Sequence, residues 1–353
     1  MHHDRAQLVP ANAETIARGA DILRRGGLVA FPTETVYGLG VHALDREAVR
    51  RLFAAKGRPA TDPLIVHVAS LDAAAPLLRR IPDEARRLAA RFWPGPLTLV
   101  MPRSALVPDE VTAGLDTVAI RVPVHPVARA LLETAAIPIA APSANLFSRP
   151  SPTQASHVMD DLAASIDLVI DGGPTTVGIE STVLDLCASP PAILRPGAVT
   201  PDLLRDVVVS TRKPTSAEAP VGKADADAPL RSPGLLERHY SPRAPLTLYE
   251  GRDALEALAR DARAAADAGQ QVAVVIGDED WMRLAEELVA VRVVQLGSSE
   301  DPAAVAARLY AVLRELDAAG IDLILVHAFV PAEGLGVAIR DRLRRAAAGR
   351  IVS

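Results

Sequence analysis

The apolar residues of this chain recur in two patterns, separated by a segment with few large apolar residues. Over the first 212 residues, short strand-like runs alternate irregularly with helical stretches, which predicts a mixed α/β domain. From about residue 245, strands and helices alternate regularly, which predicts a parallel, doubly wound sheet. We therefore predict one domain at 1–212, an extended linker at 213–244 and a smaller parallel α/β domain at 245–353.

Sequence signals set the ends of the first helices. A helix over 13–25 stops at two glycines, and a strand over 28–31 follows. Asp45 caps a second helix, which ends at Lys56-Gly57. Further strands of the first domain are predicted at 64–68, 97–101, 118–122, 138–141, 167–170, 182–186 and 192–195. Further helices are predicted at 83–91, 126–136 and 153–164.

The second domain has the more regular pattern. Its strands are predicted at 245–249, 271–276, 291–296 and 321–327. Its helices are predicted at 253–267, 279–290, 302–318 and 336–348. A Gly-Leu-Gly sequence at 334–336 precedes the last helix and is either an anion site or, more commonly, a plain loop-to-helix turn.

Composition narrows the function classes. A net charge of −5 and an aromatic content of 3% argue against a dedicated nucleic-acid binder, which needs a basic excess or stacking platforms. The single cysteine, Cys187, excludes an intramolecular disulfide and a cysteine-based zinc site, and suits a cytoplasmic location. We find no export signal and no long apolar run that predicts a membrane span.

The segment Phe31–Gly40, FPTETVYGLG, ends a strand at a proline and continues with hydroxyls, a carboxylate and two glycines. Such groups at a strand end are typical of a ligand-facing edge in an α/β domain. The segment has neither the spacing of a P-loop nor a GxGxxG pattern. A nucleotide loop is therefore a hypothesis to be tested for this segment.

Two cations follow the second helix, at Lys56 and Arg58. They could simply interact with the negative end of that helix dipole. Pro59 and Pro63 stiffen the segment, however, and rigid display of cations suits a phosphate site.

Two further polar residues lie within strand-like runs. His67 alternates with its valine neighbours, and a lone strand histidine is more often structural than a ligand. Arg121 shares a strand face with Thr117 and Ala119. A buried unpaired arginine is costly, so it should meet a carboxylate from the protein or from a ligand.

Polar residues also stand at other strand ends of the first domain. Ser143 and Asn145 follow one strand, where a local turn alone would explain them. Ser181 precedes another strand and Arg195 ends a third. Since Ser143 has no nearby base pattern and GxSxG is absent, covalent catalysis is not indicated.

These pieces occur in one order along the chain: PTETVYGLG, KGRP, PLIVHV, AIRVP, APSAN, SPT, ESTV and LRPG. This series resembles the threonylcarbamoyl-AMP synthases, the YrdC-like enzymes of transfer-RNA modification, over about residues 12–212. The sequences SPGLLERHYSP and GLGVAIRDRLRRAA resemble the linker and the second domain of the long, two-domain form. The resemblance implies a twisted mixed sheet around a large basic cavity, followed by a Rossmann-like domain.

The resemblance also implies a reaction. L-threonine, bicarbonate and ATP, which brings Mg²⁺, give L-threonylcarbamoyladenylate and pyrophosphate, so the enzyme is a nucleotidyltransferase. A partner threonylcarbamoyl-transferase complex then modifies adenosine 37 of certain tRNAs. No protein-held metal and no stable nucleic-acid binding are expected.

Site residues follow from matching motif positions. Lys56 and Arg58 resemble the catalytic cations. The implied ATP contacts are Lys56, Arg58, Asp62, Thr117, Ser143, Asn145, Ser151, Arg195 and Tyr240. The implied threonine contacts are Thr33, Thr35, His67, Arg121, Ala141 and Ser181. Asp62 stands where the family pattern has asparagine, and a carboxylate cannot donate a hydrogen bond to phosphate.

Two other functions compete with this one. An RNA-binding module could use the same basic cavity for double-stranded RNA, but the set Thr35, His67 and Arg121 would then be unexplained. A carbamoyl-transferring relative of hydrogenase maturation would carry zinc-finger segments, for which one cysteine is too few. For the synthase, we expect segment 213–242, with Tyr240, to cover the cavity and open for product release.

Overall fold

The computed structural model describes two compact units. The described residues are 5–208, 211, 229–236, 238–289 and 291–353. The first unit comprises Met1–Phe147 and Ser151–Leu235, and the second comprises Ser148–Pro150 and Leu236–Ser353. The predicted linker is thus divided at residue 235, and its part from 213 to 228 lies outside the described residues.

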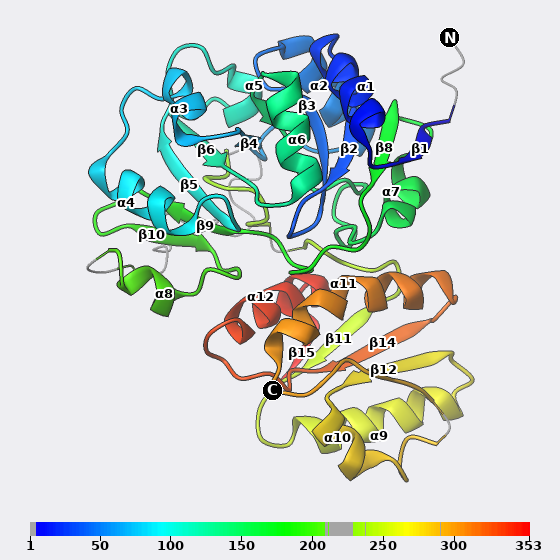
Figure 1. The fold of residues 1–353 in the computed structure, drawn as a ribbon. Helices are drawn as coiled ribbons and strands as arrows, with labels where there is room; N and C mark the ends of the chain where they lie inside the picture. Colours follow the sequence, from blue (N-terminus) through cyan, green and yellow to red (C-terminus); the bar gives the residue numbers. More distant parts are fainter. Residues whose placement is uncertain (1–4, 209–210, 212–228, 237, 290) are drawn as a thin grey trace. The chain divides into compact units, whose positions relative to one another are not determined.

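A ten-stranded mixed sheet forms the centre of the first unit, which confirms the predicted mixed α/β fold (Figure 1). The strand order is β1-β8-β2-β3-β7-β4-β6-β5-β9-β10. The strands are β1 (Gln7–Pro10), β2 (Val29–Pro32), β3 (Tyr37–His42), β4 (Ile65–His67), β5 (Leu97–Pro102), β6 (Thr117–Arg121), β7 (Ile139–Ala140), β8 (Leu168–Asp171), β9 (Thr182–Asp185) and β10 (Ala192–Arg195). Strands that are distant in sequence are neighbours in this order, so polar strand ends from several parts of the chain meet.

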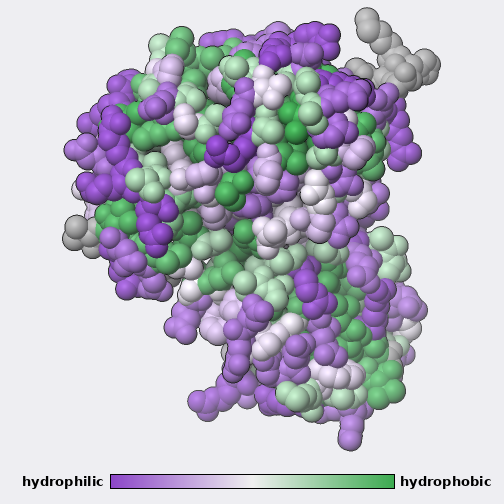
Figure 2. Space-filling view, viewed as in Figure 1, coloured by the Kyte–Doolittle hydropathy of each residue, from purple (hydrophilic) through white to green (hydrophobic). Residues whose placement is uncertain are grey.

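Helices of the first unit pack on this sheet, and α1 and α6 lie side by side in Figure 1. The helices are α1 (Ala13–Arg24), α2 (Arg46–Lys56), α3 (Leu71–Ala74), α4 (Asp83–Phe92), α5 (Asp109–Thr112), α6 (Pro126–Ala135), α7 (Ala155–Leu162) and α8 (Pro201–Arg205), with a 3-10 turn η1 (Ala75–Leu77). In Figure 2, hydrophobic residues on the visible face of this unit are scattered in small groups among hydrophilic ones.

The ends of α2 are those that the sequence predicts. The Asp45 side chain accepts hydrogen bonds from the backbone N–H groups of Glu47 and Ala48. Gly57 ends the helix in the left-handed region, with φ of 62°, where glycine is favoured. This geometry places Lys56 in the last helical turn and turns the chain at once toward Arg58.

Strand β3 was not predicted, because two glycines interrupt its apolar pattern. It pairs antiparallel with β2, so Phe31 lies opposite Gly38. A Cβ atom on Gly40 would lie 2.7 Å from the Phe31 ring and 2.9 Å from Ile139. Gly40 therefore permits close packing of β3 against Phe31 and Ile139.

The second unit contains a five-stranded, all-parallel sheet in the order β13-β12-β14-β11-β15, which confirms the predicted doubly wound arrangement. Its strands are β11 (Leu246–Tyr249), β12 (Val272–Ile276), β13 (Arg292–Gln295), β14 (Leu323–His327) and β15 (Ile351–Val352). Its helices are α9 (Ala254–Asp267), α10 (Asp278–Leu284), α11 (Pro302–Ala318) and α12 (Gly336–Ala347). Helix α10 is shorter than predicted, and β15 was too short to predict.

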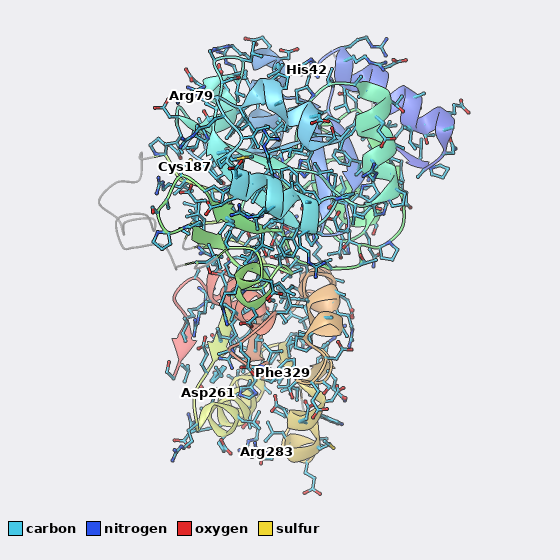
Figure 3. All side chains as sticks on the ribbon, turned by 60° about the vertical axis from the view of Figure 1, so that its left-hand side comes forward. His42, Arg79, Cys187, Asp261, Arg283 and Phe329 are labelled. Carbon is cyan, nitrogen blue, oxygen red and sulfur yellow. The ribbon has the colours of Figure 1, made fainter. Side chains whose placement is uncertain are left out.

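Close packing also explains glycines in the second unit. A Cβ atom on Gly336 would lie 1.9 Å from the Pro331 carbonyl oxygen, which favours the turn interpretation of the Gly-Leu-Gly sequence. A Cβ atom on Gly277 would lie 2.6 Å from the ring of Phe329, which Figure 3 labels. No helix among the described residues has the length and apolar character that crossing a membrane requires.

Candidate functional site

The first unit buries many polar and charged side chains. The buried residues that the sequence pointed to are Thr33, Thr35, Lys56, Arg58, Asp62, His67, Arg121, Asn145, Ser151, Ser181 and Arg195. Burying such groups is costly unless each has polar partners. The hydrogen-bond and ion-pair partners of these side chains therefore show which groups are already satisfied within the protein and which kind of ligand the site suits.

Arg121 ends strand β6 and is held by groups from the turn between β2 and β3. Its Nη2 atom lies 2.6 Å from Oε1 of Glu34, and its Nη1 atom donates to Oγ1 of Thr35 at 3.0 Å. Thr33 and Thr35 share a hydrogen bond between their hydroxyls at 2.8 Å. The carboxylate required for Arg121 is thus supplied by the protein, through Glu34. The result is a cation fixed beside two hydroxyls.

His67 lies beside Arg121, because parallel strands β4 and β6 pair these two residues. Burial, together with the charge of Arg121, lowers the pKa of His67 to about 3. The imidazole is therefore neutral at pH 7 and acts there as a hydrogen-bonding group. Its buried Nδ1 atom makes no hydrogen bond within the described part of the chain, so a polar ligand would satisfy it.

We expect this histidine to make stability depend on pH. The folded pKa of His67 is lower than its value of 6.5 when exposed, so the unfolded chain binds the extra proton between pH 6.5 and 3. The free energy of unfolding should fall as pH drops below 6.5, by up to about 1.4 kcal/mol per pH unit. In His67→Gln this contribution should disappear. Denaturant titrations of both proteins from pH 5 to 8 measure it, and parallel curves would contradict it.

Three buried cations, Lys56, Arg58 and Arg195, form the other part of the site. Lys56 donates through Nζ to the carbonyl oxygens of Ser143, at 2.6 Å, and Asn145. Arg58 donates to the carbonyl oxygens of Asp62 and Pro63 at 3.1 and 2.9 Å. These carbonyl oxygens orient the cations and carry no net negative charge themselves, whereas the Asp62 carboxylate, 2.9 Å from Nη2 of Arg58, forms an ion pair with that guanidinium. The cluster therefore suits an anion better than a plain helix-dipole contact would.

The loop after β7 joins the two segments that the sequence singled out. Ser143 forms an isolated antiparallel bridge with Gly38, which ties this loop to the FPTETVYGLG segment. Its carbonyl oxygen accepts from Lys56, as described above. The loop is therefore built into the site, and the local-turn interpretation of Ser143 and Asn145 does not account for these long-range contacts.

Arg195, the third buried cation, is held in place by Ser181. Its Nε atom donates to the Ser181 carbonyl oxygen, and its Nη2 atom donates to the Ser181 hydroxyl, each at 3.1 Å. The same hydroxyl lies 2.8 Å from Oγ1 of Thr98. Arg195 also donates to the Pro233 carbonyl oxygen at 3.3 Å, so the end of the predicted linker reaches this cation.

The remaining predicted residues occupy varied places. Thr117 begins β6 on the same face as Arg121, about 13 Å along the strand. The N–H of Ala141 donates to the Ile65 carbonyl oxygen at 2.9 Å. The Ser151 hydroxyl donates to Glu180 at 2.5 Å. Tyr240 belongs to the second unit, where it stacks on Tyr310 with ring centroids 5.5 Å apart.

Several partners of these residues did not emerge as candidates from the sequence. Glu34, Glu180, Thr98 and Pro233 each contact a predicted site residue, as described above. Glu34 had one usable signal, since a buried arginine demands a carboxylate and Glu34 adjoins Thr35. The contacts of Glu180, Thr98 and Pro233 depend on which strands are neighbours in the sheet. Local sequence patterns do not show the order of the strands.

Cys187 and Arg79 lie at the surface of the first unit, where Figure 3 labels both. Cys187 is exposed in the turn between β9 and β10, and the Arg79 side chain is also largely exposed. Neither belongs to the buried polar set. The site therefore contains hydroxyls, cations and carboxylates rather than a thiol.

Two family models together match most of the chain. The model described as telomere recombination matches residues 21–197. The model described as the C-terminal domain of threonylcarbamoyl-AMP synthase matches residues 199–348. The two matches meet near the end of the first predicted domain.

Similar proteins agree with this division. The threonylcarbamoyl-AMP synthase of Pyrococcus abyssi is 45% identical over 336 residues, with 94% of each chain covered. That of Bacillus subtilis is 43% identical over 344 residues, which cover 97% of this chain and 95% of the relative. A crystal structure of P. abyssi Sua5 complexed with L-threonine has a TM-score of 0.89 at 42% identity and covers 98% of this chain and 99% of that one.

Proposed function

We propose, on the premise that this chain belongs to the threonylcarbamoyl-AMP synthase family, that it condenses L-threonine, bicarbonate and ATP. The products are L-threonylcarbamoyladenylate and pyrophosphate, which makes the enzyme a nucleotidyltransferase. The adenylate then serves a threonylcarbamoyl-transferase complex that modifies adenosine 37 of tRNA. The observation that carries the proposal is the burial, within one unit, of Arg121 fixed beside Thr35 and of three further cations, Lys56, Arg58 and Arg195.

The first site suits an amino acid. Arg121 can receive a carboxylate through charge-assisted hydrogen bonds, beside the hydroxyl of Thr35. Neutral His67 offers a further polar contact at its buried Nδ1 atom. The P. abyssi relative is complexed with L-threonine, which supports the same ligand here.

The second site suits a triphosphate. Lys56, Arg58 and Arg195 are all buried cations, with exposed fractions of 2%, 8% and 3%. Cations at this depth can surround a small anion that enters the protein. The backbone of an RNA duplex cannot reach them, so their burial favours the synthase over the RNA-binding module.

The proposed reaction requires the substrates to be held in position and does not require a nucleophile from the protein. The threonine amine attacks bicarbonate and forms a carbamate, with loss of water. A carbamate oxygen then attacks the α-phosphorus of ATP and displaces pyrophosphate. Holding two anions together and offsetting the phosphate charge are the tasks left to the protein, and its fixed cations supply both.

Magnesium is proposed to enter with the nucleotide. Mg²⁺ usually keeps water and phosphate ligands in nucleotide sites, where it offsets phosphate charge. The described residues contain no group of three or more metal-binding side chains, and the buried carboxylate of Asp62 is already paired with Arg58.

Pyrophosphate release from ATP should require both L-threonine and bicarbonate. The reason is that the attacking oxygen belongs to a carbamate, which forms only from both. Purified protein is assayed for pyrophosphate with each substrate omitted in turn, and with serine or glycine replacing threonine. Equal release without threonine, or with the other amino acids, would contradict the assignment.

A further inference from the structure

Asp62 is fully buried, with an exposed fraction of 0%, beside one cation of the cluster, Arg58. Its Oδ1 atom lies 2.9 Å from Nη2 of Arg58. Its own carbonyl oxygen and that of Pro63 accept from the same guanidinium. Asp62 therefore fixes Arg58 through both its side chain and its backbone.

Burial and the three cations of the cluster act in opposite directions on the pKa of Asp62. Burial raises the pKa of Asp62, while the charges of Arg58, Lys56 and Arg195, in decreasing order, act to lower it. These are the three cations assigned above to the triphosphate. A single carboxylate thus lies within electrostatic reach of every predicted phosphate cation.

Such a carboxylate is a poor phosphate ligand. An ionised carboxylate has no hydrogen to donate, and it repels the negative charge of phosphate. The resemblance described above places asparagine at this position, and an amide can donate. The aspartate of this chain is therefore a departure that changes the charge of the site without changing its shape.

We propose that Asp62 is an internal counter-ion that occupies Arg58 before substrate arrives and weakens the binding of every polyphosphate at the cation cluster. This inference rests on the proposed function and concerns the same site. Asp62 is a positioning residue, because it acts through Arg58. Its charge holds the cations in place in the free enzyme, and it also favours the release of pyrophosphate.

The test compares nucleotide binding by wild-type protein and Asp62→Asn. Asparagine keeps the size of the side chain, and the backbone acceptors of Arg58 remain. Dissociation constants are measured by calorimetry for adenosine, AMP, ADP, ATP and pyrophosphate, both with and without Mg²⁺. We expect ATP and pyrophosphate to bind about tenfold more tightly to the variant, with a smaller gain for AMP and none for adenosine.

Asp185→Asn is the matched control. Asp185 is also a buried aspartate of the first unit, with an exposed fraction of 1%, and it lies 3.6 Å from Arg231. Its replacement should leave all five constants unchanged. Asp62→Ala serves as a second neutral variant, and it should show the same dependence on phosphate charge. Melting temperatures establish that each protein is folded.

Three results would overturn the inference. Unchanged ATP binding in both folded Asp62 variants would remove the counter-ion role while leaving the proposed function intact. Weaker ATP binding only in the presence of Mg²⁺ would make Asp62 a magnesium ligand instead. Absence of ATP binding in the wild-type protein would overturn the proposed function, and this inference with it.

Discussion

Replacing Arg58 with alanine is expected to reduce pyrophosphate release by about 10³-fold. The guanidinium is buried and oriented by fixed acceptors, so it can offset charge on the triphosphate without reorganising. Loss of one such preorganised cation in phosphoryl-transfer sites typically costs this much or more. The measurement is the threonine- and bicarbonate-dependent pyrophosphate assay at saturating substrates.

Stability must be controlled in this experiment, because Arg58→Ala leaves Asp62 buried without its partner. Removing one member of a buried ion pair typically costs about 3–5 kcal/mol. The double variant Arg58→Ala/Asp62→Asn removes the stranded charge and should fold, yet remain inactive. Arg24→Ala is the matched control, since Arg24 donates to carbonyl oxygens of α6 outside the site. Near-normal turnover in the folded double variant would remove Arg58 from the phosphate role.

Replacing Arg121 with lysine is expected to raise the KM for L-threonine by about 10- to 100-fold and to leave the KM for ATP almost unchanged. Lysine keeps the positive charge beside Glu34 but loses the planar fork that binds a carboxylate with two hydrogen bonds. Hydrogen bonds to charged groups contribute about 1.5–3 kcal/mol, and each 1.4 kcal/mol is a factor of ten.

The informative measurement for Arg121 is the change in the KM for L-threonine compared with the change in the KM for ATP. A variant with general damage to the fold would raise both KM values or lose activity altogether. An equal rise in both would place Arg121 outside the amino-acid site. Arg103→Lys offers a control at another arginine of the first unit, one that pairs with Asp109 away from the buried set.

Local sequence signals predicted the regular elements well. The Asp45 cap, the Gly57 stop and the start of α6 at Pro126 depend on neighbouring residues, so the pattern alone locates them. Strand β3 was not predicted because Gly38 and Gly40 interrupt the alternation of apolar residues that indicates a strand. Those glycines make sense only once Phe31 and Ile139 are known to pack against them.

The candidate site was partly predictable from the sequence. A buried arginine on an apolar strand requires a carboxylate partner, so the sequence predicts that Arg121 has one. The sequence does not predict which carboxylate it is. Glu34 becomes that partner only because a ten-stranded sheet brings the β2–β3 turn to the end of β6. The contact of Arg195 with Pro233 likewise depends on the path of the chain after β10.

Ser181 has a thermodynamic consequence of its own. Its hydroxyl and carbonyl groups hold Arg195, while the family pattern assigns the same residue to threonine. If L-threonine contacts Ser181 as proposed and redirects it, the surroundings of Arg195 change, and we then expect the binding of L-threonine and ATP to be linked. Linkage is reciprocal, so any factor by which threonine alters the affinity for ATP is also the factor by which ATP alters the affinity for threonine.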